Sequence, residues 1–268
     1  MAVSTGQSET TGTTGRRTTG RRVPDSASIH PGPGFRIRED FPRVAPEIVA
    51  AYREFATTDI SDLLNRLYAL DSEIGYLAGP EGSVSGLACT VRAYLGDNLM
   101  VHKSLDIAKP GDIVVIAANG SKSYAVLGDV ISTKGKHRGI GGYVVDGLIR
   151  DLPAIKPLGM PVYARGTTPI GPLHRGPGEI NYPIACGGVV VNPGDIVVAD
   201  QAGVVIVPQS VAEELLERLR RYTSGNENYL AAVQRGEFSN AWVDQQLDAN
   251  ACPTEPGLDI DPNAPTGE

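Results

Sequence analysis

The sequence predicts a layered α/β domain built around a mixed sheet, and three observations support this fold class. Glycine and proline are abundant, at 32 and 20 of the 268 residues, and only 6% of the chain is aromatic. That composition favours short strands joined by tight turns over long helical bundles. Short apolar runs alternate with helix-like segments in the middle of the chain, and further strand-like runs follow near its C-terminal end.

The overall composition also limits the classes of function. The chain is 41% hydrophobic and has a net charge of -7, with no basic stripe in its folded part. Nucleic acid is therefore not an expected partner, because neutralising its backbone requires clustered Lys and Arg. Three cysteines without a close pair favour a reducing compartment over a disulfide framework. No apolar run is long enough to span a bilayer or to act as a signal peptide, so we expect a cytoplasmic protein without membrane contact.

The two ends of the chain have the composition of disordered segments. Residues 1–36 are rich in Thr, Gly, Ser, Arg and Pro and show no hydrophobic period. Residues 251–268 form an acidic tail with several prolines. Between these ends, we expect an α/β domain over residues 37–222 and a C-terminal helical extension over residues 223–250, in which Gly225 interrupts the helical pattern.

The ordered part begins with two helices whose role is packing. Apolar residues recur at helical spacing in both, at Ile48, Tyr52 and Phe55 and then at Ile60, Leu63, Leu64 and Leu67. Thr58 is suited to cap the second helix.

Short apolar runs bounded by turn residues then predict the strands. We expect strands at residues 87–95, 113–117, 143–145, 162–164, 189–191, 196–199 and 204–207. We expect helices at residues 124–136, 152–158 and 210–222. The turn Pro110-Gly111-Asp112 recurs as Pro193-Gly194-Asp195, and each copy leads into a strand, which hints at two similar strand units in one sandwich or barrel-like core.

The residues that suggest chemistry lie between Leu127 and Asp151. If Gly128 opens a helix, the free N–H groups of its first turn can bind a carboxylate or phosphate. The strand at 143–145 then delivers Arg150 and Asp151 at its C-terminal end, where α/β sheets usually place ligands. Singly, these residues have structural explanations: close packing, an ion pair, or a helix cap. Together they match what an anionic, enolisable substrate requires.

These motifs resemble the family of 4-hydroxy-4-methyl-2-oxoglutarate aldolases, which also contains oxaloacetate decarboxylases and proteins like the regulator of ribonuclease activity A. The resemblance covers roughly residues 44–209, and it rests on the segments 128–131, 144–151, 186–195 and 200–208. It implies an α/β/β/α sandwich of the swivelling-domain type with a mixed sheet, flanked by N- and C-terminal helices. It also implies a homotrimer or homohexamer with sites at the subunit boundaries.

The activity implied by the resemblance is that of a metal-dependent lyase. Such an enzyme cleaves short 2-oxo dicarboxylic acids through a metal-stabilised enolate, by retro-aldol release of pyruvate, by decarboxylation of oxaloacetate, or by both. The backbone N–H groups of the loop would bind the substrate carboxylate, and this loop consists of Gly128, Asp129, Val130 and Ile131. The metal would be Mg²⁺, Mn²⁺ or another divalent ion.

The resemblance also assigns the roles of the charged residues. Arg150 would bind the pyruvyl part of the substrate and stabilise its enolate oxygen. Asp151 would hold the metal, largely through water. Asp129 would position the water that moves the proton. Ala154 departs from the family pattern, because metal-dependent members usually have an acidic residue at that place, and such losses can weaken metal affinity about ten- to a hundredfold.

Two other functions remain open at this point. One is a protein-binding regulator that kept the scaffold and lost the chemistry, which Ala154 and the two terminal extensions allow. The other is a swivelling phosphohistidine carrier, which would need a histidine where Tyr143 stands.

Two smaller features complete the candidate site residues. The polar, glycine-rich loop at 171–179 is either a surface loop or a source of substrate contacts from His174, Arg175 or Glu179. Cys186 is expected to be buried and inert.

Overall fold

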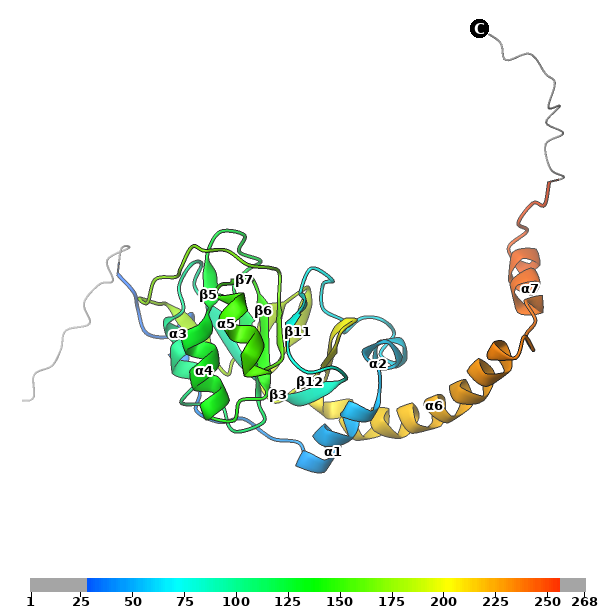
Figure 1. Ribbon diagram of the computed structural model, residues 1–268, viewed down its shortest axis with the longest axis horizontal. Helices are drawn as coiled ribbons and strands as arrows, with labels where there is room; N and C mark the ends of the chain where they lie inside the picture. The colour runs from blue at the N-terminus through cyan, green and yellow to red at the C-terminus, as the bar shows by residue number, and fades with distance from the viewer. Residues whose placement is uncertain (1–27, 256–268) are drawn as a thin grey trace, which may run out of the picture.

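Buried valine, isoleucine and alanine residues make up most of the central strands Ile113–Ala117 and Ile196–Asp200 of this protein. The computed structural model describes residues 28–255, and Figure 1 shows their arrangement. The strands are β1 (Phe35–Ile37), β2 (Gly75–Ala78), β3 (Val84–Ala93), β4 (Ile113–Ala117), β5 (Ala125–Leu127), β6 (Gly142–Asp146), β7 (Leu148–Ile149), β8 (Val162–Ala164), β9 (Gly178–Ile180), β10 (Ile184–Cys186), β11 (Val189–Val191), β12 (Ile196–Asp200) and β13 (Gly203–Val207). The α-helices are α1 (Pro46–Ala51), α2 (Thr57–Leu63), α3 (Leu99–Ser104), α4 (Asp129–His137), α5 (Leu152–Ile155), α6 (Ala212–Gln234) and α7 (Ala241–Ala249).

Within this range, nine strands form one mixed sheet. Seven follow the order β1-β9-β3-β4-β6-β8-β2, and β12 and β13 join through β3. Strands β3, β4, β6 and β8 are parallel, whereas β9 and β2 run antiparallel to their neighbours β3 and β8. Strand β3 connects the two halves: its residues 84–87 pair antiparallel with β12, and its residues 88–92 pair with β4.

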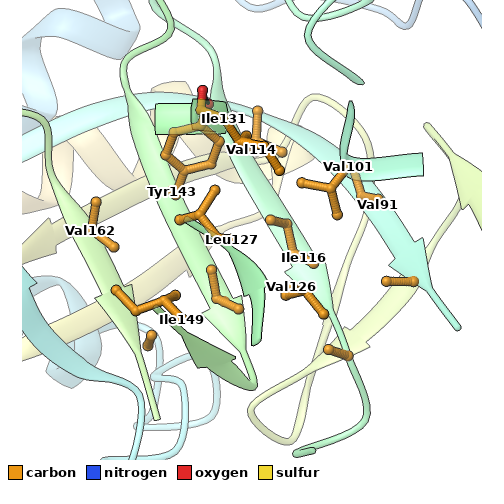
Figure 2. Close-up of a cluster of buried hydrophobic side chains, with 14 of the residues drawn as sticks. Val91, Val101, Val114, Ile116, Val126, Leu127, Ile131, Tyr143, Ile149 and Val162 are labelled. Carbon is orange, nitrogen blue, oxygen red and sulfur yellow. Dashed lines mark hydrogen bonds between the residues drawn. The ribbon is translucent and has the colours of Figure 1, made fainter. Parts of the chain in front are cut away.

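Alternation along the strands produces four layers. In β4, Val114 and Ile116 point into a core beneath α3, α4 and α5, part of which Figure 2 shows. Ile113 and Val115 point the other way, into a second core shared with β10 to β13. In β12 the opposite face enters a third core with α1, α2 and α6. Because successive side chains of a strand face opposite sides, this pattern is an α/β/β/α sandwich, and the predicted fold class is confirmed.

The predicted strands are all present, but several expected boundaries were wrong. The strand expected at 87–95 runs from Val84 to Ala93. The helix expected from residue 124 is preceded by strand β5 and begins at Asp129, because β5 pairs in parallel with β7. Thr58 does not cap α2. Instead, Asp200 accepts hydrogen bonds from both the backbone N–H and the hydroxyl of Thr57.

The expected end segments also need correction. The predicted leader 1–36 extends too far, because β1 pairs in parallel with β9 at Phe35, Arg36 and Ile37. Residues 1–27 of that leader, and residues 256–268 of the predicted tail, lie outside the described residues. The boundary expected between residues 222 and 223 falls inside α6, which continues through Gly225. The predicted interruption at Gly225 is therefore wrong.

Helix α6 begins on the domain and ends away from it. Its first turns bury Leu215, Leu216 and Leu219 in the third core, and the buried Tyr52 hydroxyl donates a 2.6 Å hydrogen bond to the carbonyl of Ala212. Figure 1 shows the rest of α6 leaving the domain, with α7 beyond it. Among residues 28–255, none of the helices has the length and hydropathy needed to cross a membrane.

Candidate functional site

The pairing of two short strands brings the expected site residues together. Strand β5 ends at Leu127, and the chain passes through Gly128 directly into α4. Strand β7 ends at Ile149 beside it, and the backbone N–H of Arg150 donates a 2.9 Å hydrogen bond to the carbonyl of Leu127. The first turn of α4 and the segment Arg150-Asp151 therefore both follow the carboxyl ends of these two parallel strands and lie side by side.

Gly128 is required by the close approach of these two segments. A Cβ atom at Gly128 would lie 2.8 Å from Oδ2 of Asp151 and 3.2 Å from Nε of Arg150. Any side chain at this position would displace the charged pair. The N–H groups of the first turn of α4 have no carbonyl acceptor one turn earlier in the helix, although that of Val130 bonds the Asp129 carboxylate, and they carry the positive end of the helix dipole. The arrangement suits an anion.

Arg150 and Asp151 form an ion pair, with 3.1 Å between Nε and Oδ2. Both side chains are about two-fifths exposed, at 42% and 39%. Asp151 has a positive φ of 58°, a conformation that is uncommon outside glycine and that often occurs at functional sites. Its side chain makes no capping hydrogen bond to α5, whereas its carbonyl accepts the N–H groups of Ala154 and Ile155. The alternative that Asp151 serves as a side-chain cap is thus not supported.

A cavity of about 230 Å³ opens at this point. Its lining residues are Asn98, His102, Leu127, Gly128, Asp129, Val130, Ile131, Arg150, Pro172 and His174. Five of the residues expected from the sequence line it, and the sixth, Asp151, is held beside it through Arg150.

The wall of the cavity opposite α4 was not predicted in full. His102 and Asn98 belong to α3 and its N-terminal boundary, where no motif marks them. The rings of His102 and His174 meet edge to face, with 5.6 Å between their centroids. Burial lowers the pKa of His102, and electrostatic repulsion from Lys134 and His174 lowers it further.

The loop at 171–179 contributes two residues to the cavity lining, Pro172 and His174, and of these only His174 has a polar side chain. A Cβ atom at Gly171 would overlap the Arg150 guanidinium, so the loop backbone lies directly on that group. Glu179 is 3% exposed on β9, where it pairs with Arg36 at 2.8 Å and Arg92 at 3.4 Å, which is a structural role. Of the three residues of this loop that the sequence offered as possible substrate contacts, only His174 lines the cavity.

The described residues offer few metal ligands. No group of three or more His, Cys, Asp or Glu side chains between residues 28 and 255 is arranged to hold a metal ion. The Asp129 carboxylate accepts a 2.7 Å hydrogen bond from the N–H of Val130, and Ala154 is exposed on α5. A hard cation that keeps most of its water, with Asp151 as protein ligand, fits this donor set. A fully protein-coordinated ion does not.

A second charged cluster lies outside the cavity. Arg165 pairs with Asp146 at 2.6 Å and with Asp71 at 2.9 Å, and Asp146 also accepts the N–H of Gly187. These contacts tie β6, β8 and the turn after β10 together. Cys186 beside them is fully buried, as predicted, and burial raises the pKa of its thiol.

Comparison with known proteins shows which family this chain resembles. The model of the RraA-like family, described as Aldolase/RraA, matches residues 57–206. A Halalkalibacterium halodurans protein provisionally named a 4-hydroxy-4-methyl-2-oxoglutarate aldolase is 41% identical over 181 residues, which are 68% of this chain and 86% of that protein. A Hahella chejuensis protein with the same provisional name is 32% identical over 159 residues, covering 59% of this chain and 96% of that protein.

Solved structures agree with the sequence comparison. Streptomyces coelicolor RraAS2, described as an unusual member of the RNase ES inhibitor RraA protein family, is 31% identical with a TM-score of 0.64, covering 71% of this chain and 98% of that one. The RNA-processing inhibitor RraA of Thermus thermophilis is 30% identical with a TM-score of 0.53, covering 57% of this chain and 93% of that one. From its matched segment, its relatives and its fold, the chain belongs to the RraA-like family.

Proposed function

We propose that this protein is a divalent-metal-dependent carbon–carbon lyase acting on short 2-oxo dicarboxylic acids. Its reaction would be retro-aldol release of pyruvate from substrates like 4-hydroxy-4-methyl-2-oxoglutarate, decarboxylation of oxaloacetate, or both. The observation that carries the proposal is the single cavity lined by the first turn of α4 and by Arg150, with Asp151 paired to Arg150 beside it. The provisional names of the sequence relatives point to the same reaction.

The site residues divide this chemistry between them. Breaking the carbon–carbon bond next to a 2-oxo group leaves an enolate, and Arg150 places a fixed positive charge where that oxygen develops. The first turn of α4 binds the substrate carboxylate through its N–H groups. Asp129 positions water for proton movement. Asp151 would hold a divalent metal, which would supply Lewis-acid chemistry to the site.

A second candidate function is that of a non-catalytic protein-binding regulator. Ala154 favours it, since this position offers no carboxylate near the proposed metal. The solved relatives favour it as well, since one is described as an RNA-processing inhibitor and another as an unusual member of an RNase ES inhibitor family. The cavity favours the lyase, because a regulator has no need to keep Gly128, Arg150 and Asp151 in contact.

The assembly proposed with this function is a homotrimer or homohexamer. Exposed apolar side chains gather beside the cavity, at Tyr94, Leu95, Tyr124, Ile170 and Leu173. Two of them approach the same glycine, because the N–H of Leu173 donates to the carbonyl of Gly96 and the Tyr124 ring lies against Gly96. Large exposed apolar patches commonly mark interfaces. Light scattering that finds a monomer at micromolar concentration would overturn this assembly.

The test of the lyase is pyruvate release from purified protein. Oxaloacetate and 4-hydroxy-4-methyl-2-oxoglutarate are each supplied with Mg²⁺, with Mn²⁺, and with a chelator. We expect metal-dependent pyruvate release that is faster than the release in a control with metal and no protein. This control is needed because oxaloacetate also decarboxylates in the presence of free metal. A wild-type rate equal to that of metal alone, for both substrates, would leave the regulator as the better proposal.

A further inference from the structure

We propose that His174 is the base that takes the hydroxyl proton during aldol cleavage, and that Asn98 holds its imidazole in the tautomer this step requires. The inference rests on the proposed lyase function and adds a residue to its site. The observations behind it are the hydrogen bonds of Asn98, the anchoring of the loop around His174, and the cavity that both residues share with Arg150.

The orientation of the Asn98 amide is fixed by the main chain. Asn98 is 4% exposed, and its Nδ2 donates a 3.2 Å hydrogen bond to the carbonyl of Val126 on β5. Turning the amide over would set two carbonyl oxygens against each other at that point. The Oδ1 atom of Asn98 therefore faces away from Val126, and it lies 2.6 Å from Nδ1 of His174.

This contact determines which imidazole nitrogen of His174 carries the hydrogen. An amide oxygen can only accept a hydrogen bond, so Nδ1 of His174 must be the donor. In the neutral ring, the lone pair then belongs to Nε2. Asn98 thus orients the imidazole much as a carboxylate orients the base of a hydrolase, without placing a charge beside it.

The backbone on either side of His174 is anchored to the segment that carries Asn98. Leu173 donates from its N–H to the carbonyl of Gly96 at 2.7 Å and accepts from the N–H of Asn98 at 3.0 Å. The N–H of Arg175 donates to the buried Asp97 carboxylate. A histidine in an ordinary surface loop needs no such support, whereas a proton-transfer group needs a fixed position.

The proposed step balances as follows. Nε2 of His174 accepts the proton of the substrate's tertiary hydroxyl, and the oxygen lone pair forms the new carbonyl. The electrons of the breaking carbon–carbon bond pass to the enolate of pyruvate, which Arg150 stabilises. The enolate carbon then takes a proton from water held by Asp129. The imidazolium returns its proton to the hydroxide so formed, which restores the neutral ring.

The second imidazole and the nearby charges are compatible with this step. The rings of His102 and His174 meet edge to face, and burial lowers the pKa of His102, which disfavours a second positive charge beside the imidazolium. The other charged groups of this region are Asp97 and Arg175 next to Asn98 and His174, Asp129 and Lys134 on α4, and Arg150 after β7. None of them is hydrogen-bonded to His174 among the contacts of residues 28–255.

Comparison of two substrates separates this role from a structural one. Decarboxylation of oxaloacetate breaks its carbon–carbon bond without removing a hydroxyl proton, so it needs no base in that step. We expect His174→Ala and His174→Gln to lower kcat for aldol cleavage by about 10² to 10⁴-fold, the usual contribution of acid–base catalysis. Oxaloacetate decarboxylation should fall far less. Arg175→Ala is the matched control, because its side chain lies outside the cavity lining and the backbone bond to Asp97 remains.

Asn98→Ala tests the positioning of the ring. We expect it to reduce aldol cleavage while leaving decarboxylation largely intact, and ¹⁵N NMR of the imidazole should show the Nδ1–H tautomer in the wild type and lose that preference in the variant. Equal losses for both substrates in the His174 variants, or an Nε2–H tautomer in the wild type, would overturn the inference. If the wild type cleaves neither substrate, the proposed function itself fails, and the NMR result still reports separately on the Asn98–His174 geometry.

Discussion

The hydroxyl group of Tyr143 occupies the space where a side chain at Gly135 would begin. Tyr143 comes from β6 beneath α4, and its hydroxyl lies 3.3 Å from the carbonyl oxygen of Ile131, one turn before Gly135 (Figure 2). A Cβ atom at Gly135 would overlap this hydroxyl and stand 3.1 Å from Cζ of the ring. The glycine therefore lets α4 settle onto the sheet, and it places the first turn of the helix at the cavity.

This contact predicts that Gly135→Ala destabilises the protein. In the interior of a solvent-exposed helix, a change from glycine to alanine stabilises the helix by roughly 1 kcal/mol. Here we expect a loss of about 1–3 kcal/mol in the free energy of unfolding, as for other overpacked sites. Urea denaturation of Gly135→Ala, of Tyr143→Phe and of the double variant measures the coupling energy between the two positions. Because Tyr143→Phe removes the overlapping hydroxyl, the double variant should be more stable than the sum of the two single changes predicts. A stabilised Gly135→Ala protein would contradict the packing described.

Gly128→Ala should affect the site and leave the fold nearly unchanged. The added methyl group would stand 2.8 Å from Oδ2 of Asp151 and 3.2 Å from Nε of Arg150, both on side chains that can move into solvent. We expect pyruvate release to drop by about 10²-fold, comparable to losing one preorganised donor, because the charged pair is displaced.

Gly75→Ala is the control for that variant. Gly75 lies on β2, and a Cβ atom there would meet nothing within 4 Å. It should keep full activity and melt like the wild type. A Gly128→Ala protein with undiminished activity would show that the close contact between the loop and the charged pair has no functional role.

Residues 1–27 and strand β1 should differ in their importance for stability. Removing residues 1–27 should leave the cooperative unfolding transition in place. Removing residues 1–37 should lower the melting temperature, because it deletes β1 and exposes Glu179, whose carboxylate is buried against Arg36. A buried carboxylate that loses a partner is destabilising. Thermal melts of the two truncated proteins decide this, and equal melting temperatures would contradict it.

The fold was largely predictable because its signals are local. Strands β4, β8 and β11 match their predicted runs residue for residue, since each is a short apolar segment between turn residues. Strand β9 was missed because it contains Glu179, whose burial depends on Arg36 and Arg92 far away in sequence. Strand β5 was taken as part of a helix because only its pairing with β7 defines it.

The site was predictable on one side only. Its glycine loop and charged pair lie in one continuous motif, whose order along the chain reveals their proximity. Asn98 and His102 were missed because the short helix α3 carries no motif, and its place opposite α4 follows from tertiary packing. His174 was marked only as one of three possible contacts, and the bond to Asn98 that distinguishes it is visible only in the structure.

His102 should make the stability of the protein sensitive to acid. Its pKa is lowered in the folded protein by burial, by Lys134 and by His174, so the unfolded chain binds a proton at higher pH than the folded chain does. Stability is therefore lost as the pH falls below about 6.5, the ordinary value for imidazole. As the pH is lowered from 8 to 5, the melting temperature of the His102→Gln variant should approach that of the wild type or exceed it.

Arg150→Ala and Asp151→Ala should both abolish lyase activity, by different routes. Arg150 stabilises charge that grows as the enolate forms, so its loss should lower turnover by about 10² to 10³-fold even at saturating substrate. Under the proposed function Asp151 would act through the metal, so its loss should first weaken the Mg²⁺ dependence and be partly rescued by excess metal. Neither variant should melt much earlier than the wild type, because an ion pair between side chains this exposed contributes at most about 1 kcal/mol. A purely structural pair would show the reverse: early melting in both variants, with a residual activity that keeps the wild-type response to metal. Pyruvate release measured against Mg²⁺ concentration, together with thermal melts of the same preparations, distinguishes the two roles.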